Sequence, residues 1–444
     1  MQVTFIMPCV GRKPESAYPR SWMMEPLAIA QLSTLTPPEW HRRFYDDRMD
    51  PIPYDEPTDV VALNVETYTA KRAYQIARRY RDRGVPVVMG GFHPTLVPDE
   101  AAQHADAVVV GEAEGVWPAV VADLAAGKLK PRYASDRPPL SGRWPDRSIY
   151  AGKPYLELSL VETGRGCLFG CDFCSIASFF RSSYSARPVE DVVNEVASLR
   201  YKTVFFVDDN LCVDRERTRR LLEALVPLRI RWMGQVSIGA ARDENLLALM
   251  RKSGCAGVLI GFESLDPASL AAMHKTMNPT SADECGRAVR RFAAHGIAIY
   301  ATFVFGYDTD TQLSFKRTLD FAIGQKFFFA AFNHLVPFPG TPLFIRLKAE
   351  KRLIDDPWWL SDKHRFGDVV FEPKQMSSGE LTRLCFEYRR RFYRYRSILQ
   401  RATAFGSNLR SPFMAFLYLS QNVAARRDVV GRQGLPLGIL GEGV

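Results

Sequence analysis

The sequence has few cysteines, no long apolar run and no sign of a secretion signal. Its eight cysteines in 444 residues are too few for the disulfide framework of a small secreted protein. The first residues, Met1 to Met7, read as a strand and not as a basic segment followed by an apolar one. No uninterrupted apolar stretch is long enough to span a bilayer. We therefore expect a reduced, cytoplasmic protein, whose hydrophobic content of 47% is ample for two or three packed domains.

The chain carries an excess of positive charge, which by itself does not identify a binding partner. The net charge of +9 could favour acidic cofactors, anionic lipid or nucleic acid. Arginines and aromatic residues alternate over 386–402, but no RNA-binding motif accompanies them, so we predict no nucleic-acid partner. The default expectation is a helical segment that packs on the preceding domain, with peripheral membrane contact as the alternative.

Three cysteines, Cys167, Cys171 and Cys174, follow an alternating strand-like run. Each thiolate can hold one iron of a 4Fe-4S cluster, which leaves the fourth iron open to bind a small molecule. Gly166 and Gly170 permit the tight turns that such a loop requires. A zinc site is the weaker interpretation, because no second cysteine pair with matching spacing exists.

Strands and helices alternate through most of the chain, which predicts two α/β domains. Residues 1–130 are expected to form a doubly wound parallel sheet, because short continuous apolar runs alternate with helical spacing. Residues 131–152, rich in Pro, Arg, Ser and Asp, are assigned to a linker. Repeated strand–helix units over 153–350 predict a parallel barrel, open or closed. Residues 351–444 are assigned to a helical C-terminal subdomain.

The Cys-x3-Cys-x2-Cys spacing, with an aromatic residue before the last cysteine, resembles the radical S-adenosylmethionine (SAM) superfamily. The resemblance implies a partial (β/α)6 barrel in which Cys167, Cys171 and Cys174 hold the cluster. SAM would bind the open iron and yield a 5′-deoxyadenosyl radical. By the same resemblance, Glu263 and Ser264 contact SAM and Gln235 lines its pocket. The structural alternative is that carboxylates at strand ends, such as Glu263, cap the helices that follow.

Two glycine loops ahead of the cysteines resemble the cobalamin-binding domain of B12-dependent radical SAM enzymes, the class B methyltransferase-like group. One loop contains Gly90, Gly91 and His93, and the other contains Gly111 and Glu112. The resemblance implies that these residues lie against cobalamin, where glycine lets the backbone approach a large ligand. His93 is expected to be a turn histidine and not a cobalt ligand. The Asp-x-His-x-x-Gly motif, whose histidine binds cobalt from below, is missing.

The combined prediction is a radical SAM enzyme with a 4Fe-4S cluster, SAM and cobalamin that methylates an unactivated carbon. The substrate is expected to be a small molecule or lipid-like compound, and the electron donor a reductase such as flavodoxin or ferredoxin. One alternative is a non-methylating oxidative cyclase of tetrapyrrole metabolism. Another is a cobalamin- or cluster-based sensor. A methylthiotransferase is disfavoured because only Cys9 precedes the triad.

Overall fold

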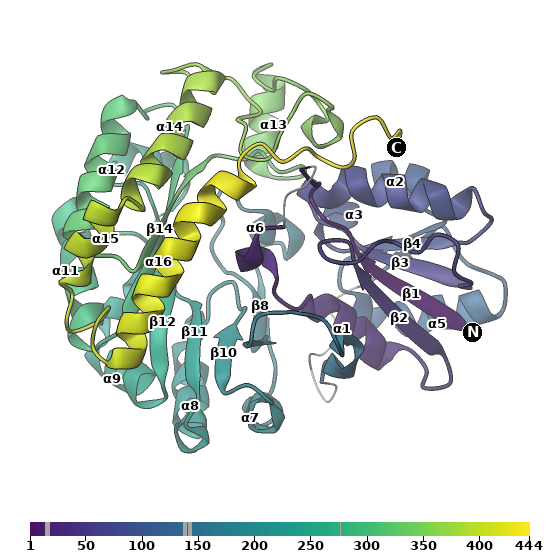
Figure 1. Cartoon of the computed structure of the whole chain (residues 1–444), viewed down its shortest axis with the longest axis horizontal. Helices are drawn as coiled ribbons and strands as arrows, with labels where there is room; N and C mark the ends of the chain where they lie inside the picture. Colours follow the sequence, from purple (N-terminus) through teal and green to yellow (C-terminus); the bar gives the residue numbers. More distant parts are fainter. Residues whose placement is uncertain (14–17, 136–139, 141–143, 276) are drawn as a thin grey trace.

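The computed structural model describes residues 1–444 apart from 14–17, 136–139, 141–143 and 276. Two parallel sheets of six strands each organise the chain, one in its first third and one in its middle. Figure 1 shows the two sheets side by side, with the short helix α6 (Ser175–Phe179) between them. The α/β fold with a doubly wound sheet, a partial barrel and a helical C-terminal portion is therefore confirmed.

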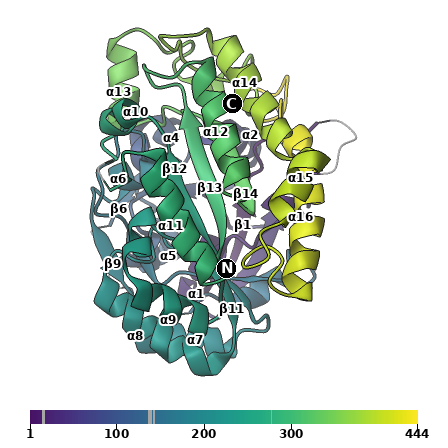
Figure 2. The same cartoon turned by 90° about the vertical axis from the view of Figure 1, so that its left-hand side faces the viewer.

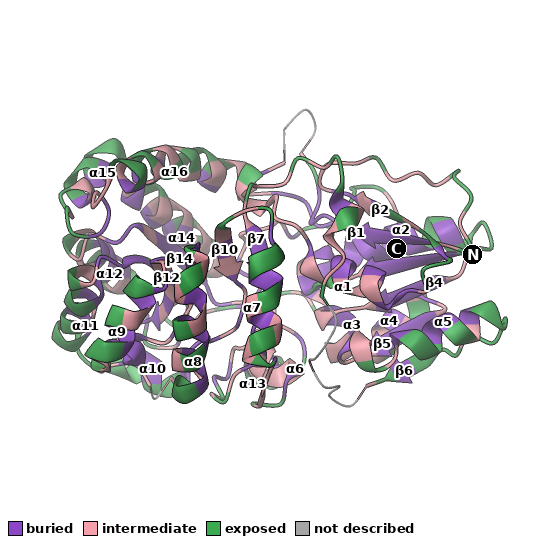
Figure 3. Cartoon of the chain, turned by 90° about the horizontal axis from the view of Figure 1, so that it is seen from below, coloured by how far each residue is buried: buried purple, intermediate pink, exposed green. Residues whose placement is uncertain are grey.

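The first sheet has the strand order β2-β1-β3-β4-β5-β6, and every neighbouring pair is parallel. Its strands are β1 (Gln2–Met7), β2 (His41–Asp46), β3 (Val60–Asn64), β4 (Val87–Gly90), β5 (Ala107–Val110) and β6 (Arg132–Ala134). Its helices are η1 (Arg20–Trp22), α1 (Leu27–Leu35), η2 (Thr67–Thr69), α2 (Ala70–Arg81), α3 (Phe92–Leu96), α4 (Pro98–His104), η3 (Ala113–Gly115), α5 (Trp117–Ala125) and η4 (Arg147–Tyr150). The central strands are buried (Figure 3) because α2 covers one face of the sheet and α1 and α5 cover the other.

Neither edge strand of this sheet was predicted from the sequence. β2 has the sequence His-Arg-Arg-Phe-Tyr-Asp and buries only two of its six side chains, so no continuous apolar run marks it. β6 has three residues, one of them buried, and lies within the stretch 131–152 that was assigned to a linker. An edge strand needs an apolar face on only one side, which weakens the sequence signal.

The second sheet has the order β14-β13-β12-β11-β10-β7, again all parallel, so that neighbours in space follow one another in sequence. Its strands are β7 (Ser159–Val161), β10 (Thr203–Phe206), β11 (Arg231–Gln235), β12 (Cys255–Glu263), β13 (Ala298–Phe305) and β14 (Phe329–His334). The intervening helices are α7 (Val189–Ser198), α8 (Arg215–Leu225), η5 (Val226–Leu228), η6 (Ile238–Arg242), α9 (Glu244–Lys252), α10 (Pro267–Ala272), α11 (Ala282–Ala294) and α12 (Gln312–Gly324). A hairpin of β8 (Gly164–Gly166) and β9 (Tyr184–Ala186) encloses α6.

Burial alternates along the barrel strands. On β13, Ile299, Ala301 and Phe303 are fully or almost fully buried, whereas Tyr300 and Thr302 between them keep accessible surface. Since side chains of a strand alternate between its faces, the buried set packs under the outer helices, which Figure 2 shows in front of β12 to β14. The accessible set faces the inside of the barrel, which therefore encloses open space.

The C-terminal portion contains α13 (Pro342–Ala349), η7 (Trp358–Leu360), α14 (Ser378–Phe392), α15 (Tyr395–Ala402) and α16 (Pro412–Arg432). The arginine- and aromatic-rich stretch forms two helices and not one, since the chain turns at Tyr393 and Arg394. α14 packs along the edge strand β14. The end of the chain returns to the first sheet, where Gly438 pairs with Gly11. No helix among the described residues combines the length and apolar character needed to cross a membrane.

Candidate active site

The three-cysteine loop joins β8 to α6 at the carboxyl edge of the barrel. Cys171 is buried, and Cys167 and Cys174 are half-buried. Gly166 begins the loop at φ +81°, where a Cβ atom would lie 2.1 Å from the carbonyl oxygen of Ser183. Any other residue at 166 would therefore force β8 and β9 apart, so this turn depends on glycine.

Asp172 anchors the loop to the barrel. Its backbone N–H donates to the carbonyl of Met273 (3.2 Å), and its own carbonyl accepts from the N–H of Leu343 (3.0 Å). Its Oδ1 accepts from the buried hydroxyl of Tyr307 at 2.5 Å, just beyond β13. Two segments of the barrel and the start of α13 thus hold Asp172, between Cys171 and Cys174, which pre-organises the thiols.

The environment of the thiols fits an iron–sulfur cluster. Burial raises the pKa of all three thiols, that of Cys171 to about 11, while the nearby charge of Lys275 lowers them. Within the described ranges, no three His, Cys, Asp or Glu side chains converge on a point that would suit a single metal ion. A 4Fe-4S cluster does not need such convergence, because each cysteine binds a different iron.

Lys275 connects the cysteine loop to the predicted SAM residues. Its Nζ lies 3.0 Å from Oε1 of Glu263 in a mostly buried ion pair. Glu263 ends β12 at an irregular pairing with β13 and has φ +60°, an uncommon value for a residue with a side chain. Its carboxylate folds back over Gly261, where a Cβ would lie 2.1 Å from Oε1. The backbone strain and the glycine together aim Glu263 at Lys275 and the cysteine loop.

The other predicted SAM residues lie on the same edge. Ser264 follows Glu263, is buried, and its Oγ accepts a hydrogen bond from the N–H of Asp266 (3.0 Å). Gln235 ends β11, and its side chain is half-buried on the inner face of the barrel. Their contact with SAM remains a prediction.

The strand-end aspartates of β10 stabilise the protein itself. Asp208 is buried and accepts hydrogen bonds from the backbone N–H (2.8 Å) and the hydroxyl (2.6 Å) of Thr163. Burial raises its pKa to about 6. The Oδ2 of Asp209 accepts from the N–H of Gly166 (2.9 Å), which supports the entry to the cysteine loop.

Arg165 ties the first domain to the cysteine loop. Its guanidinium lies 3.1 Å from Glu112 and 2.5 Å from Glu114, both in the loop after β5, and 2.7 Å from Glu162 beside β7. All four side chains are largely buried. Glu112 was predicted as a cobalamin contact, but its Oε1 pairs with Arg165. Its Oε2 is buried without a hydrogen-bond partner among the described residues.

The predicted cobalamin loops lie together at the carboxyl edge of the first sheet. Thr95 links them, because its hydroxyl donates to the carbonyl of Gly91 (2.8 Å) and accepts from the N–H of Gly111 (3.0 Å). A Cβ on Gly91 would lie 2.7 Å from Oδ1 of Asn64, and one on Gly111 would lie 2.9 Å from the carbonyl of Ser135. These two glycines are therefore required by neighbouring protein atoms, whereas Gly90 has only ordinary contacts.

His93 lies in this loop but points into the protein. Its ring has no exposed surface. Nε2 lies 3.1 Å from both the hydroxyl of Tyr74 and Oε1 of Glu100, and Nδ1 lies 3.4 Å from Thr67. With both nitrogens engaged, the ring contributes to the core under α2, and its environment does not support a cofactor contact.

The carboxyl edges of the two sheets face a shared hollow. Phe92, directly after the Gly90–Gly91 turn, packs against Phe179 of α6 with ring centroids 4.5 Å apart. Glu66, just beyond β3, has an exposed side chain, yet surrounding protein raises its pKa by desolvation. A side chain that is accessible and desolvated at once projects into an enclosed space. That space lies where ligands bind in open parallel sheets, beyond the carboxyl ends of the strands.

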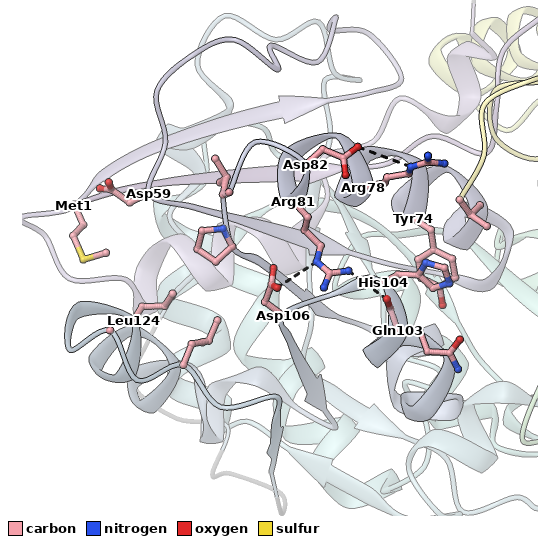
Figure 4. A pocket seen from close by; sticks show the side chains of 16 residues that line it. Met1, Asp59, Tyr74, Arg78, Arg81, Asp82, Gln103, His104, Asp106 and Leu124 are labelled. Atoms are coloured by element: carbon pink, nitrogen blue, oxygen red, sulfur yellow. Dashed lines mark hydrogen bonds and ion pairs between the residues drawn. The ribbon is translucent and has the colours of Figure 1, made fainter.

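A second cavity, of about 970 Å³, lies at the opposite edge of the first sheet. Met1, Asp59 and Asp106, which precede strands, line it together with residues of α2 and α4 (Figure 4). Arg81 pairs with Asp106 across it at 3.2 Å. None of the predicted cofactor residues lines this cavity, so it is separate from the cysteine loop.

A partial barrel with a three-cysteine loop at its carboxyl edge, facing a doubly wound sheet, defines a radical SAM enzyme that carries a second cofactor-binding domain. Sequence comparison matches residues 161–322 to the radical SAM superfamily and residues 47–121 to the B12 binding domain. The chain is 34% identical to bacteriochlorophyllide d C-12(1)-methyltransferase of Chlorobaculum tepidum, over 85% of this chain and 84% of that protein. It is 28% identical to the C-8(2)-methyltransferase of the same organism, over 75% and 78% of the two chains.

In fold, the protein is similar to the cobalamin-dependent SAM radical enzyme OxsB, with a TM-score of 0.67 and 14% identity, over 97% of this chain and 72% of that one. The chain belongs to the cobalamin-dependent radical SAM methyltransferases. Its cofactors are accordingly a 4Fe-4S cluster, SAM and cobalamin, and the expected radical methylation is confirmed at the level of the family.

Two residues of this site were not found from the sequence. Lys275 follows a buried helix end in a segment without a motif, and Arg165 is one of many arginines. Arg165 lies two residues before the first cysteine, and this position was the one sequence feature that could have identified it as part of the site. For Lys275 there was none, because its role depends on a contact with Glu263 across the barrel edge.

Proposed function

We propose that this enzyme methylates an unactivated carbon of a tetrapyrrole. The similarity to two bacteriochlorophyllide methyltransferases, which extends over both domains, supports this substrate class most strongly. When bound, the cluster and SAM supply a hydrogen-abstracting radical and cobalamin supplies the methyl group. The protein then has to position these groups and the reacting carbon of the substrate relative to one another.

For the radical-forming half, we propose that Cys167, Cys171 and Cys174 hold the cluster. Glu263 and Ser264 would contact SAM, and Gln235 would line its pocket. The ion pair of Glu263 with Lys275 supports this arrangement, because it keeps both a carboxylate and an ammonium beside the cysteine loop. SAM carries an ammonium and a carboxylate that such groups can recognise.

For the cobalamin half, we propose that the backbone at Gly90, Gly91 and Gly111 borders the corrin ring. Glu112 would act indirectly, through its ion pair with Arg165. His93 is the histidine within these loops, and its ring is buried. We therefore propose that these loops would hold cobalamin through backbone groups and without a contribution from His93.

An aromatic wall beside the hollow supports a flat, largely apolar substrate. Tyr68 lies at the centre, with ring centroids 5.0 Å from Phe366 and 6.0 Å from Phe338. Trp22 contacts Phe366 at 4.9 Å. These rings come from both domains and from the C-terminal portion, so the complete fold is needed to form the wall.

The proposal is tested by incubating the reconstituted enzyme anaerobically with bacteriochlorophyllide d and SAM that carries a deuterated methyl group. A product heavier by one labelled methyl group is expected, and the Cys171→Ala variant should yield none. Deoxyadenosine without label in the product would indicate a cyclase-type reaction instead. No SAM cleavage in any condition would favour a sensor.

We also propose two contacts outside the active site. A small reductase such as flavodoxin or ferredoxin would reduce the cluster, since the cysteine loop is held near the surface by half-buried residues.

Peripheral membrane contact is supported by large exposed side chains on α15, α16 and the loop between them: Leu399 (66%), Phe405 (71%) and Phe416 (71%). Arginines such as Arg396 accompany them and would favour anionic lipid. Flotation with anionic vesicles at low salt tests this contact, and loss of flotation is expected when Phe405 and Phe416 are changed to Ser.

A further inference from the structure

Two arginines with unused hydrogen-bond donors lie in the last turns of α14 and α16, which pack against each other. Arg389, in the last turn of α14, donates from Nη2 to the carbonyl of Phe332 (2.9 Å) and to Oδ1 of Asn333 (3.3 Å). Among the described residues no acidic side chain lies within ion-pair distance of it, and its Nε and Nη1 make no hydrogen bond. Asn333 is itself exposed on the edge strand β14.

Arg432 ends α16, which packs against α14. Its Nη2 donates to Oγ of Ser21, and its guanidinium lies 5.0 Å from the ring centre of Trp22. The nearest carboxylate, Asp428, is 3.8 Å away, at the limit of an ion pair. Its Nε is buried without a partner among the described atoms, and burial lowers its pKa. Figure 1 shows the end of α16 beside the N-terminal segment that follows β1.

Tyr300 of β13 pairs with Phe329 of β14, the strand whose Phe332 and Asn333 contact Arg389. Its side chain points into the barrel and keeps 36% of its surface accessible. Burial raises its pKa, and the positive charges of Arg432 and Arg389 lower it. An aromatic hydroxyl and two cations therefore lie on neighbouring elements of the barrel domain and the C-terminal portion.

Arg401 shows what a structural arginine in this protein looks like. It is fully buried, and its guanidinium donates to the carbonyls of Phe327, Phe328 and Phe392 and to the side chains of Ser397 and Asn422. Its donors are thus satisfied by the protein. Arg389 and Arg432 keep unused donors and accessible surface, which structural packing does not require.

We infer that Arg389 and Arg432, with Tyr300, bind a carboxylate of the substrate. A carboxylate would take up the unused guanidinium donors of both arginines and balance the charge of Arg389, which has no ion-pair partner among the described residues. The aromatic wall of Trp22, Tyr68 and Phe366 would then hold the apolar part of the same molecule. The inference rests on the proposed function, since it assigns the polar end of a tetrapyrrole acid to this site.

The test compares an acid with its neutral ester. The reconstituted holoenzyme is titrated with pheophorbide a, a chlorin with one free carboxylate, and with its methyl ester, and binding is followed by quenching of tryptophan fluorescence. The acid is expected to bind about ten- to a hundredfold more tightly, the range of a charge-assisted hydrogen-bond pair. Palmitate and methyl palmitate serve as a second pair that contains no chlorin.

Substitutions then locate the effect. Arg389→Met and Arg432→Met should each weaken binding of the acid about tenfold or more and leave binding of the ester unchanged. Arg390→Met is the matched control, because Arg390 is the exposed neighbour on the same helix. Circular dichroism melting shows whether each variant is folded. The wild-type comparison of acid with ester needs no variant.

The possible results separate this inference from the proposed function. Equal affinity for acid and ester in both pairs would overturn the carboxylate site, even if labelled methyl transfer to a tetrapyrrole is observed. Preference for palmitate over its ester without any chlorin binding would support the site and contradict the tetrapyrrole substrate. If Arg389→Met or Arg432→Met instead weakens SAM binding or abolishes SAM cleavage without substrate, the anion is that of SAM and the inference is wrong.

Discussion

Replacing Arg165 with Met should uncouple the first domain from the cysteine loop. Arg165 is the common partner of Glu112, Glu114 and Glu162, at 3.1, 2.5 and 2.7 Å. Its removal leaves three carboxylates close together in a region where burial already raises the pKa of Glu162 to about 7. Truncation of one partner in a buried ion pair costs about 3–5 kcal/mol. Part of that cost will be recovered as one carboxylate takes up a proton, so we expect the lower end of the range.

Hydrogen–deuterium exchange measures this effect locally, which suits a chain with two domains. A loss of about 3 kcal/mol corresponds to about a hundredfold faster exchange in peptides that cover 107–116 and 159–174. Arg165→Lys should recover part of the protection, because it retains the charge but cannot contact three carboxylates at once. Arg132→Met is the control, since Arg132 pairs with the exposed Asp99 and such surface pairs contribute little. Exchange in Arg165→Met as slow as in this control would refute the role assigned to Arg165.

The remaining predictions concern a titrating group and two glycines. Burial raises the pKa of Asp310 from its ordinary 3.8 to about 6, so the folded state holds its proton more tightly and stability is lost as pH rises through this range. Relative to wild type, Asp310→Asn should therefore gain about 2.4 kcal/mol in free energy of unfolding between pH 4 and pH 7. A difference that is constant with pH in urea titrations would contradict this. Gly261→Ala should displace Glu263 and weaken SAM binding at least tenfold in anaerobic calorimetry, whereas Gly379→Ala, where a Cβ meets nothing within 4 Å, should leave it unchanged. Gly91→Ala should lower the free energy of unfolding by about 2 kcal/mol, because φ is +109° and a Cβ would lie 2.7 Å from Oδ1 of Asn64; an unchanged melting temperature would show that the turn relaxes.

Local sequence patterns were sufficient for much of the fold. Continuous apolar runs such as Val60–Asn64 can be buried on both faces only inside a parallel sheet, and the central strands were predicted for that reason. The edge strand His41–Asp46 was missed because one exposed edge lets charged residues occupy half of its positions. Glu263 was found because it stands at the end of a clear strand, within a recognisable segment.

What the sequence by itself determined is the chemistry that depends on neighbours in the chain: the three-cysteine loop, the turns at Gly91 and Gly166, and the alternation of strands and helices. Only the tertiary structure decided which distant groups meet there. In the tertiary structure the His93 ring is buried in the core, Lys275 forms an ion pair with Glu263, and Arg165 forms one with Glu112. The tertiary structure also packs α14, which carries Arg389, against β14 and against α16, which ends at Arg432. The physical reason is that cysteine spacing is a local property, whereas pairing between charged groups depends on the packing of whole helices and strands, which no short pattern encodes.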